Sequence, residues 1–270
     1  MKTPVSSFRI QRIENGSIES TDDLLVAEEP LEIRLGHGPI DDRKEIQLSV
    51  TMRTPGNDEE LALGFLFTEG IISDPSDLIS IKHCVDVKEE EKGNVIRAEL
   101  DPQIAIDPQK WQRSFYTTSS CGVCGKSSLD AVLVQCRPIG SIGDPDPKVI
   151  ASLPEKMRGA QTVFKHTGGI HAAALFDREG KLLLLREDIG RHNAVDKLIG
   201  SMLIHAIDPA QKFMLVSGRA GFELVQKCAV AGIPLMAAVG APSSLAVDLA
   251  RSTGLKLIGF LRGDRFNIYS

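Results

Sequence analysis

The second half of the chain alternates short apolar runs with helical patterns, which restricts the folds open to it. From residue 148 onward we predict helix 148–159, strands 169–176 and 181–187, helix 193–206, strand 213–217, helix 222–231, strand 234–239, helix 243–253 and strand 256–261. The runs at 182–185 and 213–216 are apolar throughout, which is typical of strands in a sheet covered on both faces by helices. We therefore expect a three-layer α/β/α domain over residues 144–270, beginning at a boundary marked by Pro145 and Pro147.

The first half predicts a smaller unit of mixed type. Residues 29–35 and 45–52 alternate apolar and polar side chains as half-buried strands do, and a turn at 36–39 would pair them. A helix follows at 58–67, with further strands at 79–87 and 94–100. We expect a small α+β domain over residues 1–112, joined to the larger domain by a cysteine-bearing loop and helix over 113–143.

Composition excludes several classes of protein. The chain has 270 residues, 42% of them hydrophobic, which is enough for a sizeable core. A formal net charge of -5 argues against general binding to nucleic acid or membrane surfaces, and no apolar run is long enough to cross a bilayer. Residues 1–10 carry no apolar signal segment, so we expect a cytoplasmic protein.

Two cysteines, Cys121 and Cys124, stand in a Cys-x-x-Cys motif flanked by Gly125 and Lys126. A helix start or a nearby cation lowers the pKa of a thiol, so this setting favours reactive sulfur chemistry. A structural zinc site usually needs two such pairs, and the chain has only this one, so we predict no metal. A zinc or iron–sulfur site shared across a dimer remains an open alternative.

The remaining cysteines, Cys84, Cys136 and Cys228, stand in apolar stretches and are expected to be buried small hydrophobic residues. His171 is expected to be a hydrogen-bonded core residue. We assign no role to the other histidines in apolar surroundings, which are His37, His83 and His205.

Polar residues gather where three predicted strands give way to helices, at 186–193, 217–221 and 240–244. The carboxyl ends of strands in open α/β sheets are the usual ligand site, and helix N-termini there favour anions. A phosphate-bearing ligand held by Arg191, His192, Ser217 and Arg219 is one interpretation; turn and cap residues without a ligand are the other.

The last strand is followed by Arg262 and Arg265 around Gly263, with Phe260 just before them. Arginine suits a phosphate or a guanine edge, and an aromatic ring can stack on a base. A solvated tail is the simpler alternative.

Several motifs taken together resemble the formate dehydrogenase accessory sulfurtransferase family, FdhD. The resemblance covers nearly the whole chain and is carried by the segments at 54–56, 61–66, 120–126, 167–173, 186–197, 217–219 and 240–247.

This resemblance implies a sulfurtransferase that receives sulfur from a cysteine desulfurase as a persulfide on Cys121. The sulfur would pass to the molybdenum cofactor, bis-molybdopterin guanine dinucleotide, which formate dehydrogenase needs. Cys124 matches the second cysteine of the motif. The family's cofactor-binding segment falls on Phe260, Leu261, Arg262, Gly263, Asp264 and Arg265.

The resemblance also implies a cytidine-deaminase-like fold and a homodimer. The His-x-Glu and Pro-Cys-x-x-Cys motifs that hold zinc in deaminases are absent from this sequence. A carrier that binds the molybdenum cofactor without sulfur chemistry is the alternative function.

Overall fold

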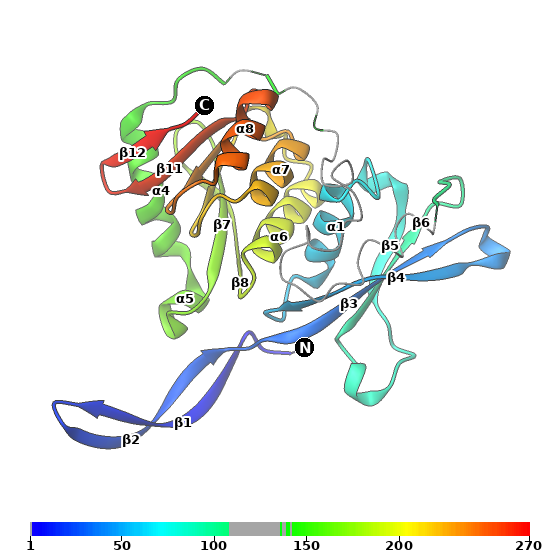
Figure 1. Cartoon of the computed structure of the whole chain (residues 1–270). Helices are drawn as coiled ribbons and strands as arrows, with labels where there is room; N and C mark the ends of the chain where they lie inside the picture. Colours follow the sequence, from blue (N-terminus) through cyan, green and yellow to red (C-terminus); the bar gives the residue numbers. More distant parts are fainter. Residues whose placement is uncertain (1, 108–135, 137–138, 141) are drawn as a thin grey trace.

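A six-stranded sheet forms the centre of the larger part of the molecule (Figure 1). The computed structural model describes residues 2–107, 136, 139–140 and 142–270. The strand order is β12-β11-β10-β9-β7-β8, and β9, β10 and β11 are parallel while β7, β8 and β12 pair antiparallel to their neighbours. These strands are β7 (His171–Phe176), β8 (Leu182–Asp188), β9 (Phe213–Val216), β10 (Leu235–Ala238), β11 (Lys256–Arg262) and β12 (Arg265–Ile268).

Helices cover both faces of this sheet, as the apolar strand runs predicted. On one face α6 (Arg191–Ile204), α7 (Phe222–Val230) and α8 (Ser244–Thr253) enclose a core that includes Leu198 and Val225. On the other face α4 (Pro147–Ala160) packs Ile150 and Leu153 against the strands. The short α5 (Thr162–Thr167) and the edge strand β12 are additions that the sequence pattern did not predict.

A second sheet of four strands forms the smaller part. Its strands are β3 (Glu29–His37), β4 (Lys44–Arg53), β5 (Leu78–His83) and β6 (Val95–Leu100), in the order β4-β3-β6-β5. The predicted pairing of β3 with β4 is confirmed, and β6 adds to β3 in parallel. Helix α1 (Asp58–Thr68) packs against one face of this sheet through Leu61 and Leu66.

Short 3-10 turns lie at Ile40–Asp42, Pro75–Asp77, Glu89–Glu91 and Pro209–Gln211.

An N-terminal hairpin extends away from the rest of the molecule (Figure 1). It consists of β1 (Val5–Glu14) and β2 (Ser17–Val26), joined by Asn15 and Gly16 with φ of 52° and 81°. Two consecutive positive φ values are characteristic of a type I′ hairpin turn, which Asn-Gly favours. The sequence pattern does not predict this hairpin, because its strands are largely exposed and lack a buried face.

The two sheets are joined by a close contact between helices α1 and α6. Gly64 lies against the backbone of Asp196, and Gly200 lies against the backbone of Glu60. Side chains at these positions would keep the helices apart, so the two glycines set their separation. In the part of the chain that the structure describes, no helix is long and apolar enough to span a bilayer.

Candidate functional site

The motif cysteines Cys121 and Cys124 lie outside the described residues. Of the other three, Cys228 is buried in α7 as expected, whereas Cys84 and Cys136 are partly exposed, contrary to the prediction. Cys84 follows the last residue of β5, where the strand pairing ends. Burial raises the pKa of all three thiols, which therefore favour the protonated form.

The charged residues at the end of β8 are engaged within the fold. Arg186 donates to Glu60 of α1 at 2.6 Å and to Ser201 of α6 at 2.8 Å. Glu187 accepts from the backbone N–H groups of Val163 and Phe164, each at 2.9 Å, at the start of α5. These two side chains are hydrogen-bonded to neighbouring helices and are therefore not available to bind a ligand.

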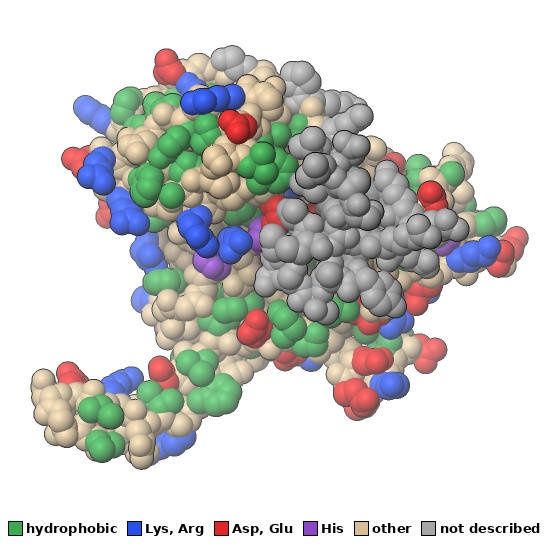
Figure 2. All heavy atoms as spheres, in the orientation of Figure 1, with side chains coloured by type: hydrophobic (Ala, Val, Ile, Leu, Met, Phe, Trp, Pro, Cys, Tyr) green, Lys and Arg blue, Asp and Glu red, His purple; other side chains and the backbone are tan. Residues whose placement is uncertain are grey.

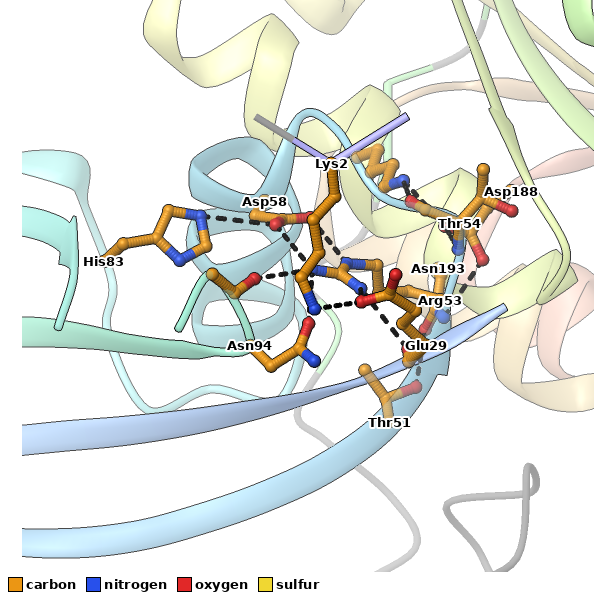
Figure 3. A network of polar contacts seen from close by, with 12 residues as sticks. Lys2, Glu29, Thr51, Arg53, Thr54, Asp58, His83, Asn94, Asp188 and Asn193 are labelled. Carbon is orange, nitrogen blue, oxygen red and sulfur yellow. Dashed lines mark hydrogen bonds and ion pairs between the residues drawn. The ribbon is translucent and has the colours of Figure 1, made fainter. Parts of the chain in front are cut away.

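Asp188, fully buried, ties the start of α6 to the loop after β4 (Figure 3). Its Oδ1 accepts from the Gly190 N–H at 2.8 Å and from Asn193 Nδ2 at 3.1 Å. Its Oδ2 lies 2.7 Å from Lys197 Nζ and accepts from the Thr54 N–H at 3.1 Å. Lys197 in turn donates to the Thr54 carbonyl at 2.7 Å. We call the group formed by Asp188, Lys197, Asn193 and Thr54 the latch.

A neighbouring charged cluster lies at the start of α1 (Figure 3). Arg53 is fully buried and forms a bidentate pair with Asp58, both bonds being 2.9 Å. His83 Nε2 lies 3.3 Å from Asp58, so the prediction that this histidine lacks polar neighbours was wrong. Burial opposes ionisation of Asp58, but hydrogen bonds from His83 and Arg53 and nearby positive charge outweigh it and lower its pKa to about 2. The hydrogen bond to Asp58 raises the pKa of His83.

A third buried cluster joins α1, α6 and α7. Lys227 Nζ lies 3.0 Å from Asp196 and 3.1 Å from Glu69, and donates to Thr68 at 2.8 Å. Burial disfavours the charged lysine, but the carboxylates of Asp196 and Glu69 outweigh it and raise the pKa of Lys227. This cluster connects three helices, and its members Lys227 and Asp196 are almost fully buried, so we assign it a structural role.

The exposed end of the sheet presents a different set of side chains. Arg191 is the first residue of α6, and His192 Nε2 lies 2.6 Å from Glu223 in the first turn of α7. His171 begins β7, and a Cβ atom at Gly218 would lie 3.5 Å from its imidazole ring. Burial lowers the pKa of His171, and the positive charges of Arg191 and His192 lower it further. The sequence pattern does not predict the pairing of His192 with Glu223, because the two residues are distant in the chain.

The side chains of four arginines near the carboxyl ends of β8, β9 and β11 form no ion pair or hydrogen bond with any described residue; these are Arg191, Arg219, Arg262 and Arg265. Arginines elsewhere in the fold, such as Arg34, Arg43 and Arg97, pair with carboxylates. Figure 2 shows Lys, Arg and His side chains gathered on this face of the molecule. The surplus positive charge favours an anionic ligand at this edge of the sheet.

The segment 260–265 forms the end of β11 and its turn into β12. Phe260 has φ of 54° at an irregularity in the strand pairing, donates its N–H to the Gly240 carbonyl, and is 36% exposed. Leu261 is fully buried, so only its backbone can reach a ligand. Gly263 turns the chain with φ of 55°, and Asp264 is exposed.

Ser217, the remaining candidate, has a structural contact. Its Oγ accepts from the Ala172 N–H at 2.9 Å, which fixes the start of β7 against the end of β9. The described residues contain no group of three His, Cys, Asp or Glu side chains arranged to hold a metal ion.

Comparison with models of known protein families identifies the relatives of this chain. The model of the FdhD/NarQ family matches residues 26–270. The chain belongs to the FdhD/NarQ family. This confirms the resemblance drawn from the sequence motifs. The FdhD/NarQ match begins at the last residue of β2, so almost all of the N-terminal hairpin precedes it.

Curated FdhD relatives are similar over nearly their full lengths. "Sulfur carrier protein FdhD" of Streptomyces coelicolor is 49% identical over 268 residues, covering 97% of this chain and 92% of that protein. The protein of the same name from Thermoplasma volcanium is 44% identical over 263 residues, again covering 97% and 92%.

A solved structure has the same fold. It is described as a putative formate dehydrogenase accessory protein from Desulfotalea psychrophila, with a TM-score of 0.76 and 25% identity over 99% of this chain and 97% of that chain.

Proposed function

We propose that this protein is a sulfurtransferase that carries sulfur as a Cys121 persulfide to the molybdenum cofactor of formate dehydrogenase. The observation that carries the proposal is the near full-length similarity to proteins named sulfur carrier protein FdhD. The four unpaired arginines support it, because the proposed cargo, bis-molybdopterin guanine dinucleotide, carries two diphosphate groups.

The sulfur step uses the two motif cysteines. The Cys121 thiolate attacks the terminal sulfur of a persulfide on a cysteine desulfurase, whose S–S bond breaks and whose thiolate leaves. Cys121 then carries the extra sulfur. Attack by the Cys124 thiolate on Cys121 releases hydrosulfide to the cargo and leaves a Cys121–Cys124 disulfide, which an external dithiol reduces before the next cycle.

The cargo site is the edge formed by the ends of β8, β9 and β11. In this proposal Arg191 and Arg219 hold one diphosphate, and Arg262 and Arg265 hold the second nucleotide or its guanine edge. Phe260 offers a partly exposed ring for stacking. By family resemblance the proposal includes a cytidine-deaminase-like arrangement of residues 144–270, a homodimer, a cytoplasmic location and formate dehydrogenase as recipient.

Mass spectrometry of the full chain tests the sulfur step. After incubation with a cysteine desulfurase and cysteine, we expect a gain of one sulfur atom that dithiothreitol removes. The Cys121→Ala variant should gain none, while Cys84→Ala, which removes a partly exposed cysteine in the described region, should gain sulfur normally. If the wild-type chain gained no sulfur, the alternative function would remain, namely a carrier that binds the molybdenum cofactor without sulfur chemistry.

Calorimetry with GDP-mannose, a guanosine diphosphate diester, tests the cargo site. Arg219→Ala and Arg262→Ala should each weaken binding about tenfold, as expected for loss of a charge-assisted contact of ~1.4 kcal/mol. Arg178→Ala is the control, because Arg178 is exposed and contacts Gln211 at 3.2 Å. Equal affinities for all four proteins would contradict the assignment of these arginines.

A further inference from the structure

We propose that His171 takes up a proton when the anionic cargo binds at the carboxyl edge of the six-stranded sheet. Binding of the diphosphate would thus be coupled to a change of charge on this imidazole. The inference rests on the proposed function, because it presupposes that a phosphate-bearing ligand binds at this edge.

His171 occupies the position from which such coupling is possible. It is the first residue of β7 and is only partly buried. Its ring lies against Gly218, which has no side chain to separate the imidazole from the turn carrying Arg219. Within the described ranges, no residue forms a hydrogen bond to the ring. The imidazole nitrogens are therefore free to respond to a ligand at this edge.

The charges around His171 favour its neutral form while no ligand is bound. Burial lowers the pKa of His171, and Arg191 and His192 at the start of α6 lower it further. Asp188 of β8 is its cross-strand partner and favours protonation, but that carboxylate is already paired with Lys197. Glu223 of α7 is paired with His192.

A bound diphosphate changes this balance. Two negative charges near Arg191 and Arg219 would offset the field that opposes protonation, and an imidazolium could donate to a phosphate oxygen. Affinity should then rise as the pH falls from the raised pKa of His171 in the complex towards its lowered pKa in the free protein, by up to about tenfold per pH unit for one proton taken up. A neutral or permanently charged side chain at 171 would give no such dependence.

The probe must not titrate in this range. GDP is unsuitable, because a terminal phosphate has a second pKa of about 6. GDP-mannose has only diester phosphates and keeps a constant charge.

The experiment is titration calorimetry of the full chain with GDP-mannose at neutral pH in two buffers of different ionisation enthalpy. For the wild type, the observed enthalpies should differ between buffers, reporting uptake of up to one proton per site. His171→Gln should still bind but show equal enthalpies. His205→Gln should behave as the wild type, because His205 lies at the far end of α6, where its Nδ1 is 2.8 Å from the Ser201 carbonyl.

Histidine NMR supplies a readout that a purely structural role would not change. The pKa of His171 should rise on saturation with GDP-mannose by about the amount that the pH dependence of affinity requires. Binding without proton uptake, or uptake that persists in His171→Gln, would overturn this inference and leave the proposed function intact. Absence of binding would overturn the cargo site and this inference together.

Discussion

Gly64 of α1 lies directly against the backbone of Asp196 in α6: a Cβ atom at position 64 would be 1.9 Å from the Asp196 carbonyl oxygen. Gly200 has the same relationship to the Glu60 carbonyl. Each helix therefore places a glycine, which has no side chain, against the backbone of the other helix. The latch lies next to this contact, because Lys197 is in α6 and its acceptor Thr54 shortly precedes α1.

Gly64→Ala should destabilise the protein, because carbonyl backbone cannot move aside as a flexible side chain could. We expect a loss of about 3 kcal/mol in the free energy of unfolding, measured by urea denaturation. Gly159→Ala in α4 is the matched control: it has open space around its Cβ position, and should gain roughly 0.5–1 kcal/mol. A tolerated alanine at 64 would show that the helices can separate freely.

Lys197→Met should remove the positive partner of Asp188 while keeping a side chain of similar length. Because both groups are buried, the unpaired carboxylate should cost about 3–5 kcal/mol of unfolding free energy. Lys92→Met, which breaks the exposed pair with Glu89, should change stability by less than about 1 kcal/mol. Similar losses in the two variants would mean that the latch contributes no more than a surface pair.

Acid should weaken the protein through Asp58. Its pKa in the folded state is about 2, below the unfolded value of 3.8, so its contribution is fully present above about pH 4 and is lost as the pH falls towards 2. The shift corresponds to about 2 kcal/mol. Denaturation at a series of pH values should show the stability difference between wild type and Asp58→Asn shrinking on acidification. A difference that stays constant with pH would contradict the depressed pKa.

Ala206→Gly should stabilise the end of α6. Ala206 has φ of 49°, a left-handed conformation in which a Cβ atom is unfavourable. Glycine should therefore raise the free energy of unfolding by roughly 1 kcal/mol. The reverse change, Gly168→Ala after α5, should lower it by a similar amount, since Gly168 has φ of 67° and no steric neighbour. Thermal unfolding of the two variants measures both changes in stability.

Local pattern was sufficient to predict the elements that have a buried face. The run around Phe213 identified a strand buried on both faces, and the alternation in β3 and β4 identified a half-buried pair. The run around Leu182 also identified a strand, but it forms the edge of the sheet and its leucines are only partly buried. The same reasoning missed β1 and β2, which pair with each other while exposing most of their side chains. A strand without a buried face has no hydrophobic period to detect.

The sequence by itself determined the family, the order of the main elements and the cysteine motif, because these reside in neighbouring residues. It could not separate Glu187 and Asp188, which are engaged in the fold, from Arg191, which is not, although all stand in one junction. Their partners, such as Thr54 and Val163, are distant in the chain. Only tertiary contacts decide which charges are neutralised internally and which remain for a ligand, since pairing depends on distance in space.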